Sequence, residues 1–254
     1  MRRFVSTFLM AGLIGSAATD VAAQTAQWED RVYLNIGFGI ESAKSTLNDS
    51  RPLTIYEEAG SASSSSTFTS GSLFDVGIGF RVWKNLSVGA GYHQEQNTAD
   101  IAVTGSAPHP IFFNTPRSFS ATAGGDQFRK ERATHLQVGW MVPFGTKLDV
   151  LLFGGPSWFR LEQPVVSDVT VAEVGPPYTE VLVNPTVTVR KKSMVGYNVG
   201  ADVSYMIWKN DSVRVGGGVF IRYAGASTTV LLLQSEQATK AGGLQIGFGG
   251  RLRF

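Results

Sequence analysis

Apolar residues alternate with polar or very small residues along most of this chain, and this alternation limits its fold more than any other feature. In the first such segment Val32, Leu34, Ile36 and Phe38 are apolar, while tyrosine, asparagine and glycine stand between them. A repeat of two residues is typical of a β-strand with one apolar face. Eight segments have this pattern and predict eight antiparallel strands: 31–41, 74–82, 86–93, 134–142, 148–153, 195–207, 213–223 and 244–254.

The fifth segment is the least regular of the eight. The face opposite its apolar face, here called the second face, carries Asp149 but also two large apolar residues, Leu151 and Phe153. Gly154, Gly155 and proline follow directly, and such residues inside a strand often mark a β-bulge. We therefore expect a bulge there that resets the phase of the strand.

Glycine dominates the second face of the strands. Glycine is unfavourable on a solvent-facing strand surface, because it weakens strands and no crowding there requires a missing side chain. The interior of a narrow closed barrel does require small residues, since the side chains of eight strands converge inside it. The apolar face is therefore expected to point outward to lipid. Fourteen of the 29 glycines lie on the predicted inner face: 37, 39, 77, 79, 89, 91, 139, 155, 196, 200, 216, 218, 247 and 249.

Short and long connections alternate strictly between the predicted strands. The short ones are 83–85, 143–146 and 208–210, and the long ones are 42–67, 96–130, 162–192 and 225–241. Outer-membrane barrels have short periplasmic turns and long extracellular loops. The sequence therefore predicts an all-β, eight-stranded antiparallel up-and-down transmembrane β-barrel with both termini in the periplasm. Trp83, Phe144 and Trp208, together with Phe254, are expected to form the inner aromatic girdle.

Composition excludes several other classes. The chain has no cysteine and a formal net charge of +2, so neither a disulfide scaffold nor a nucleic-acid binder is expected. Its mean hydropathy is +0.02 and no long apolar stretch follows the N-terminus, which excludes a helical membrane protein. Arg2 and Arg3, an apolar stretch and the small residues Ala22 and Ala23 predict a signal peptide over residues 1–23. The barrel domain is expected to span residues 24–254.

The last predicted strand carries a resemblance to a known family. Residues 244–254 alternate apolar residues and end in Phe254, and residues 152–159 read Leu-Phe-Gly-Gly-Pro-Ser-Trp-Phe. The sequence resembles small bacterial outer-membrane β-barrel proteins of the outer-membrane-protein-A and opacity-protein type. The resemblance implies that the barrel assembly machinery reads Phe254 as its signal, and that outer-membrane lipid and lipopolysaccharide surround the barrel. Because the chain stops at Phe254, we expect no peptidoglycan-binding domain and no cell-wall tethering role.

Charged residues on the inner face are the candidate functional residues. They either pair inside a lumen too narrow to stay empty, since unpaired buried charge is costly, or form a gate that a solute must pass. If the short turns set the register, Asp75 lies opposite His93, and Asp202 lies opposite Gly216 with Arg214 on the diagonal. The predicted lumen charge network is Glu41, Asp75, Arg81, His93, Glu95, Asp149, Asp202, Arg214, Arg222, Arg251 and Arg253.

Neither catalysis nor a metal site is expected from the residue pattern. His93, Asp75 and Ser87 suggest a hydrolase triad, but Ser87 is six residues from His93, about 20 Å along a strand. The three histidines offer no metal-ligand spacing, and no glycine-rich segment follows a phosphate-loop pattern. We therefore predict no catalytic residue, no cofactor site and no metal site.

The long connections hold the remaining information. Residues 61–66 predict a flexible polar tip because they are rich in serine. Residues 165–174 and 179–189 alternate valine with polar residues, which predicts a hairpin above the membrane with an exposed edge for a partner. A ten-stranded barrel or a stiffened loop are the alternatives.

The predicted function is that of a non-enzymatic outer-membrane protein in a Gram-negative envelope. It would act structurally or through surface interactions, with an extracellular ligand bound at the loops and no nucleic-acid partner. The alternative is a narrow, porin-like channel for ions or small hydrophobic solutes.

Overall fold

A computed structural model describes residues 28–42, 45–123, 125–210 and 212–254 of the chain. The predicted signal peptide, residues 1–23, lies outside these described residues. No helix within the described part of the chain is long and apolar enough to cross a membrane. The strands are β1 Val32–Ser42, β2 Ser45–Ile55, β3 Glu58–Phe68, β4 Gly71–Trp83, β5 Leu86–Ala107, β6 Arg117–Thr122, β7 Phe128–Phe144, β8 Leu148–Glu173, β9 Val181–Lys209, β10 Arg214–Leu231, β11 Glu236–Ala241 and β12 Leu244–Arg253.

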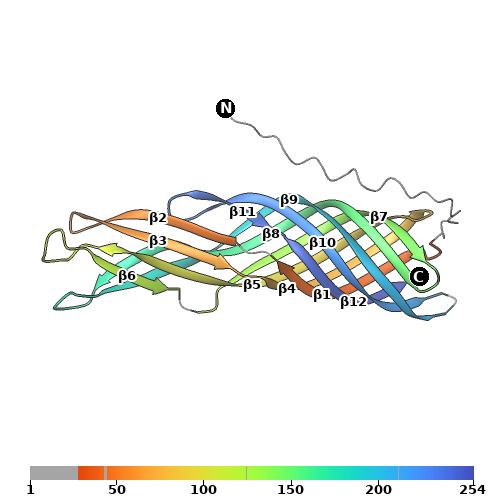
Figure 1. Ribbon diagram of the computed structural model, residues 1–254. Coiled ribbons are helices and arrows are strands. Elements are labelled where there is room, and N and C mark those ends of the chain that lie inside the picture. The colour runs from red at the N-terminus through yellow and green to blue at the C-terminus, as the bar shows by residue number, and fades with distance from the viewer. Residues whose placement is uncertain (1–27, 43–44, 124, 211) are drawn as a thin grey trace, which may run out of the picture.

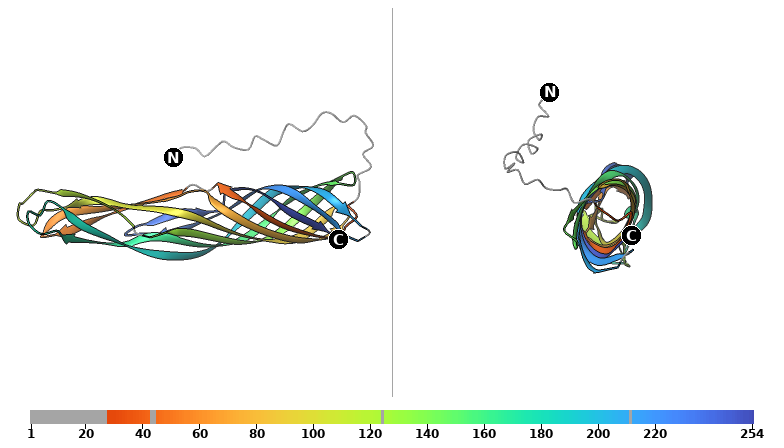
Figure 2. Two further views of the ribbon diagram at one scale, coloured as in Figure 1. Left: turned by 90° about the horizontal axis from the view of Figure 1, so that it is seen from below. Right: turned by 90° about the vertical axis from the view of Figure 1, so that its right-hand side faces the viewer.

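Eight of these strands close into a ring. β1, β4, β5, β7, β8, β9, β10 and β12 pair in this order, all antiparallel, and β12 pairs again with β1. Seen along its axis, the molecule is a closed loop of strands (Figure 2). All eight strands expected from the alternating pattern are present and belong to this ring. Because the ring is closed, none of its eight strands presents a free edge over the paired length.

Most residues of the long connections form strands, which corrects the expectation of long loops. β5, β8, β9 and β10 continue beyond the ring (Figure 1). β3 and β6 pair with β5, β11 pairs with β10, and β2 pairs with β3. We call this region the extension: β2, β3, β6 and β11 with residues 99–107, 162–173, 181–192 and 226–231. The expected valine-rich hairpin is confirmed, because Glu173 pairs with Val181 and the ladder runs down to the ring. The ring keeps eight strands, so the ten-stranded alternative is wrong.

The extension has an apolar core of its own. Small and β-branched side chains from β3, β5, β8 and β9 meet in it. Residues 61–66, expected to be a flexible tip, belong to β3, where Ser64 and Ser66 are buried. Every second residue of this segment packs inward, and the buried residues are Ala62, Ser64 and Ser66. The buried members of this core are Leu47, Ala62, Phe68, Ala99, Ile101, Val103, Ala107, Phe119, Val165, Val166, Val169, Val183, Val230 and Leu232.

Two expected details of strand register are wrong. β8 pairs with β9 without a shift through Gly154 and Gly155, so no bulge resets its phase there, and the irregularity lies between Val166 and Asp168. The whole inner face of β8 therefore keeps one parity, and Leu151 points inward with Asp149. Large apolar residues on the inner face fill space that neighbouring glycines leave open.

The register between β9 and β10 also differs from the expected one. Asp202 lies opposite Phe220 rather than Gly216. The connection is longer than expected because Asn210 Oδ1 accepts hydrogen bonds from the backbone amides two and three residues later, at 2.9 and 2.7 Å. A β-bulge between Val215 and the following glycine changes the register again. By contrast, β4 and β5 have the expected register, with Asp75 opposite His93.

Candidate functional site

The predicted lumen residues all lie on the inner face of the ring. Asp75 and Arg81 are partly buried, and the other nine are buried. Because alternate positions on the same strands carry exposed apolar residues, the ring has a polar interior and an apolar exterior. The nine buried residues are Glu41, His93, Glu95, Asp149, Asp202, Arg214, Arg222, Arg251 and Arg253.

Ion pairs neutralise much of the charge in the interior. Arg222 Nη2 lies 2.6 Å from Asp75 Oδ2, and Arg251 Nη2 lies 2.5 Å from Asp202 Oδ2. Asp75 therefore pairs with an arginine from another strand and not with His93, its partner in register. Burying these guanidinium groups is tolerable because each carboxylate compensates one of them.

Arg214 bridges two carboxylates near the short-turn end. It was expected on the diagonal from Asp202, but it instead lies 3.1 Å from Asp149 Oδ2 and also pairs with Asp30. Asp30 precedes the first strand, so strand alternation gave no signal for it. Arg253 Nη1 donates a hydrogen bond to Asn35 Oδ1 at 2.7 Å. Polar contacts thus tie the N-terminal residues to the inner wall.

Aromatic side chains fill the interior between the charged groups. Tyr33 is buried, and a Cβ atom built on Gly79 would lie 2.2 Å from its ring. Phe220 was not recognised as an inner residue, yet a Cβ on Gly247 would lie 2.5 Å from its ring. A cavity of about 30 Å³ remains beside Phe220 and Arg222. These glycines therefore make room for large inner side chains.

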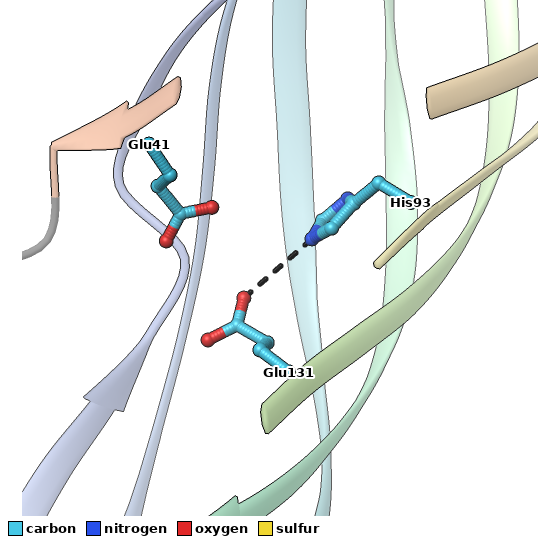
Figure 3. A group of neighbouring side chains, drawn as sticks. All are labelled: Glu41, His93 and Glu131. Carbon is cyan, nitrogen blue, oxygen red and sulfur yellow. Dashed lines mark ion pairs between the residues drawn. The ribbon is translucent and has the colours of Figure 1, made fainter. Parts of the chain in front are cut away.

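Five acidic and histidine side chains meet where the ring joins the extension, and we call them the acid–histidine cluster. Glu41, His93 and Glu131 each bring one ligand atom, and these atoms all lie within 4.8 Å of one another (Figure 3). His93 Nε2 is 3.6 Å from Glu131 Oε1, and His93 Nδ1 is 2.8 Å from His135 Nε2. The carboxyl group of Glu95 interacts electrostatically with Glu41 and Glu131. All five side chains are buried.

Three strands bring the cluster together. Glu41 is on β1, His93 and Glu95 are on β5, and Glu131 and His135 are on β7. Glu131 and His135 were not among the residues predicted for the lumen charge network. The signal was present, because His135 is an inner position of the predicted segment 134–142, and Arg129 and Glu131 continue the same parity upstream of it.

The hydrolase triad has no geometric support. Ser87 Oγ donates a hydrogen bond to the carbonyl of Gly139 at 3.3 Å, whereas His93 contacts His135 and Glu131. Asp75, the third candidate, is paired with Arg222. The three groups thus have separate partners.

The predicted girdle residues lie together at the short-turn end of the ring. Trp83, Phe144, Trp208 and Phe254 have exposed fractions of 59, 56, 53 and 46%. Phe254 also closes the ring at this end, because its backbone amide donates to the carbonyl of Val32 at 2.9 Å. Both ends of the described chain therefore lie next to the short turns (Figure 1).

Comparisons with known proteins find a similarity of structure but none of sequence. No protein-family model and no curated protein sequence matches the chain. Among solved structures, the chain is similar to Neisserial surface protein A (NspA), with 12% sequence identity and a TM-score of 0.42. The alignment covers 88% of this chain and 97% of that chain. A similarity at this level does not assign a function to the chain.

Proposed function

We propose that this chain is an integral β-barrel protein of a bacterial outer membrane, without enzymatic activity, that acts structurally or through surface contacts made by its extension. One observation carries the proposal: the ring buries its charges and exposes its large apolar side chains. A water-soluble protein would show the opposite arrangement, because large contiguous apolar patches on the surface are unfavourable in water.

The apolar belt around the ring supports insertion into lipid. Phe38, Val195, Ile207 and Phe248 have exposed fractions of 59, 66, 75 and 67%. They come from β1, β9 and β12, which are neighbours or near neighbours in the ring. In lipid such residues are favourable, and the closed ring satisfies the backbone hydrogen bonds that hydrocarbon cannot.

The aromatic residues at the short-turn end suggest an orientation. Aromatic side chains gather at the interfaces of membrane barrels, and the short turns of such barrels face the periplasm. Trp83, Phe144, Trp208 and Phe254 would then mark the periplasmic interface, with both termini on that side. The extension would stand outside the cell, and Phe254 would be the residue that the barrel assembly machinery reads.

A structured apolar tip at the end of the extension favours a surface-contact role. Residues 108–116 join β5 to β6 and expose Ile111, Phe112 and Phe113 at 65, 61 and 75%. His109 Nδ1 accepts hydrogen bonds from the amides of Ile111 and Phe112 at 3.1 and 3.2 Å. Asn114 N donates to Glu58 Oε2 at 3.1 Å. The tip is thus held in one shape, which lowers the entropic cost of binding an apolar partner.

The experiment that tests this proposal begins with membrane insertion. The chain refolded into lipid vesicles should migrate faster on gels without boiling than after boiling, as a closed barrel does. A chain that stays soluble without detergent and shows no heat-dependent mobility would overturn the proposal. Phe112→Ser with Phe113→Ser should preserve this folding and abolish binding of the vesicles to a cell surface that the unaltered protein binds.

Conductance separates this proposal from the channel alternative. Tyr33, Phe220 and the ion pairs occupy the interior, so we expect planar bilayers containing the folded protein to remain silent. Stable and reproducible single-channel steps would instead establish a pore.

A further inference from the structure

We propose that the acid–histidine cluster binds a divalent first-row transition-metal ion through Glu41, Glu131 and His93 Nε2. This inference goes beyond the membrane role proposed above, and it also departs from the absence of a metal site expected from the sequence. Spacing along the chain could not indicate the site, because its three ligands come from three strands that meet only in the closed ring.

The charges of the cluster require compensation. Glu41, Glu95 and Glu131 contribute three negative charges, and Arg129, 3.3 Å from Glu131 Oε2, contributes one positive charge. With all three carboxylates ionised, the cluster has a formal charge of −2. Arg222 does not compensate it, because this arginine is paired with Asp75. Uncompensated charge in a buried site is costly, so the cluster needs two protons or one divalent cation.

Orphaned oxygen atoms point to the cation. Glu131 Oε1 and Glu41 Oε1 are buried without a donor from any non-acidic group of the described chain, and the carboxyl group of Glu95 shares a hydrogen bond with that of Glu41 only when one of the two is protonated. The opposite oxygens of the first two are held, because Gln245 Nε2 donates to Glu41 Oε2 at 2.5 Å and the amide of Gly242 donates to Glu131 Oε2 at 2.9 Å. Each carboxylate is thus oriented on one side and open on the other, as metal-binding carboxylates are.

The histidines form a suitable relay behind the site. With Nδ1 as the donor to His135 Nε2, His93 presents the lone pair of Nε2 to the cluster. His135 Nδ1 then donates to Ser157 Oγ at 2.7 Å. Metal-binding histidines are oriented by a hydrogen bond from the second ring nitrogen in this manner. Arg222 Nη2, 3.3 Å from His93 Nδ1, favours the opposite tautomer, and a bound cation would reverse that preference.

The donor set defines the class of ion. Two carboxylates and one imidazole suit Zn²⁺, Mn²⁺, Co²⁺ or Fe²⁺ better than Ca²⁺, which prefers oxygen alone. Ligand distances of about 2.1 Å require donor atoms about 3 to 3.5 Å apart, so the side chains need to close in by about an ångström. The ion would join β1, β5 and β7 where the ring meets the extension.

The test uses the untagged full chain and Co²⁺ as the probe. The protein is refolded in detergent with an excess of Co²⁺, freed of unbound metal, and measured for metal content and for visible absorption of the bound ion. We expect one ion per chain and an X-ray absorption spectrum with one imidazole and oxygen ligands. Glu131→Gln and His93→Gln should each weaken binding about 100-fold, whereas Glu162→Gln, a matched loss of charge outside the cluster, should not.

Three outcomes would overturn the proposal: no bound ion, binding that survives both cluster variants, or a spectrum without an imidazole ligand. If a variant fails to fold, the unaltered chain still decides. Its midpoint of thermal unfolding should rise with Co²⁺ or Zn²⁺ concentration and return to the metal-free value with chelator present during refolding. An unchanged midpoint would mean that protons alone compensate the cluster.

Discussion

Arg222 on β10 reaches Asp75 on β4 across the interior of the ring, with 2.6 Å between Nη2 and Oδ2. These two strands are not neighbours, because β12 and β1 lie between them in the ring. The exposed fractions of the two side chains are 3 and 13%. The ion pair therefore links two separate parts of the ring wall through its buried interior.

Removing one member of this pair should destabilise the folded ring. Asp75→Ala leaves the Arg222 guanidinium buried without its carboxylate, which costs about 3 kcal/mol in the free energy of unfolding. Urea unfolding of the protein in vesicles measures this change in the free energy of unfolding. Asp75→Ala combined with Arg222→Met should recover much of the loss, because no unpaired charge then remains. Equal stability of Asp75→Ala and the unaltered chain would contradict this role.

Two glycines on β4 should respond differently to the same substitution. Gly79→Ala places a Cβ 2.2 Å from the Tyr33 ring, whereas Gly77→Ala meets its nearest atom at 3.8 Å. We expect Gly79→Ala to lower the free energy of unfolding by about 1–3 kcal/mol more than Gly77→Ala. Denaturant titrations in vesicles measure the difference.

The double variant Tyr33→Ala with Gly79→Ala provides the control for this prediction. Removing the aromatic ring of Tyr33 should relieve the clash. The two changes together should therefore lower the free energy of unfolding by less than the sum of their separate effects. Additive effects would show that Tyr33 does not occupy the space left by this glycine.

The ring could be predicted from the sequence because strand alternation is a local signal. Each outward position between Val32 and Ile40 is apolar, and each inner position is occupied by a residue that fits the lumen. The register of Asp75 with His93 followed from a tight turn. The register of Asp202 did not, because Asn210 Oδ1 accepts two backbone hydrogen bonds in a wider turn, and no alternating pattern indicates this.

The extension and the cluster were harder to predict for different reasons. Serine-rich residues 61–66 resemble a loop in composition, and they form a strand only because Ser64 and Ser66 pack against neighbouring strands. Glu131 carries the right parity, but its proximity to Glu41 exists only after β1 and β7 are placed in the closed ring.

Lowering the pH should destabilise the extension, because Glu173 becomes protonated. Arg117 donates two hydrogen bonds to its carboxylate, at 2.6 and 2.7 Å, and they hold the pKa of Glu173 below its usual range. A lowered pKa in the folded state adds stability above the unfolded-state pKa, about 4.3, and this contribution is lost as pH falls through the folded value. The protection factors of residues 165–190 against hydrogen exchange, which correct for the intrinsic pH dependence of amide exchange, should fall over that interval.

Glu173→Gln supplies the comparison for this pH effect. It should already exchange faster at neutral pH and should show a flatter acid response, because its side chain does not titrate. Arg117→Gln should flatten the response as well. An acid response of the unaltered protein identical to that of Glu173→Gln would contradict the assignment.

A charge should be tolerated on the extension and not on the ring. Phe248 and Leu182 are both well exposed, at 67 and 53%, but Phe248 lies in the middle of β12 and Leu182 lies in the extension. Phe248→Arg should cost about 2–4 kcal/mol near the centre of a bilayer. Leu182→Arg should leave folding in vesicles almost unchanged. Equal yields of folded protein would argue against a lipid-facing belt.

The most direct test of the membrane assignment uses the absence of cysteine from the chain. Single cysteines at Phe38, Ile207 and Phe248, and at Leu182 as the control, are labelled with an environment-sensitive fluorophore in vesicles whose acyl chains carry bromine. We predict strong quenching at the three ring positions and almost none at Leu182. Equal, weak quenching at all four positions would mean that the apolar belt does not contact lipid, and would contradict the proposed outer-membrane barrel.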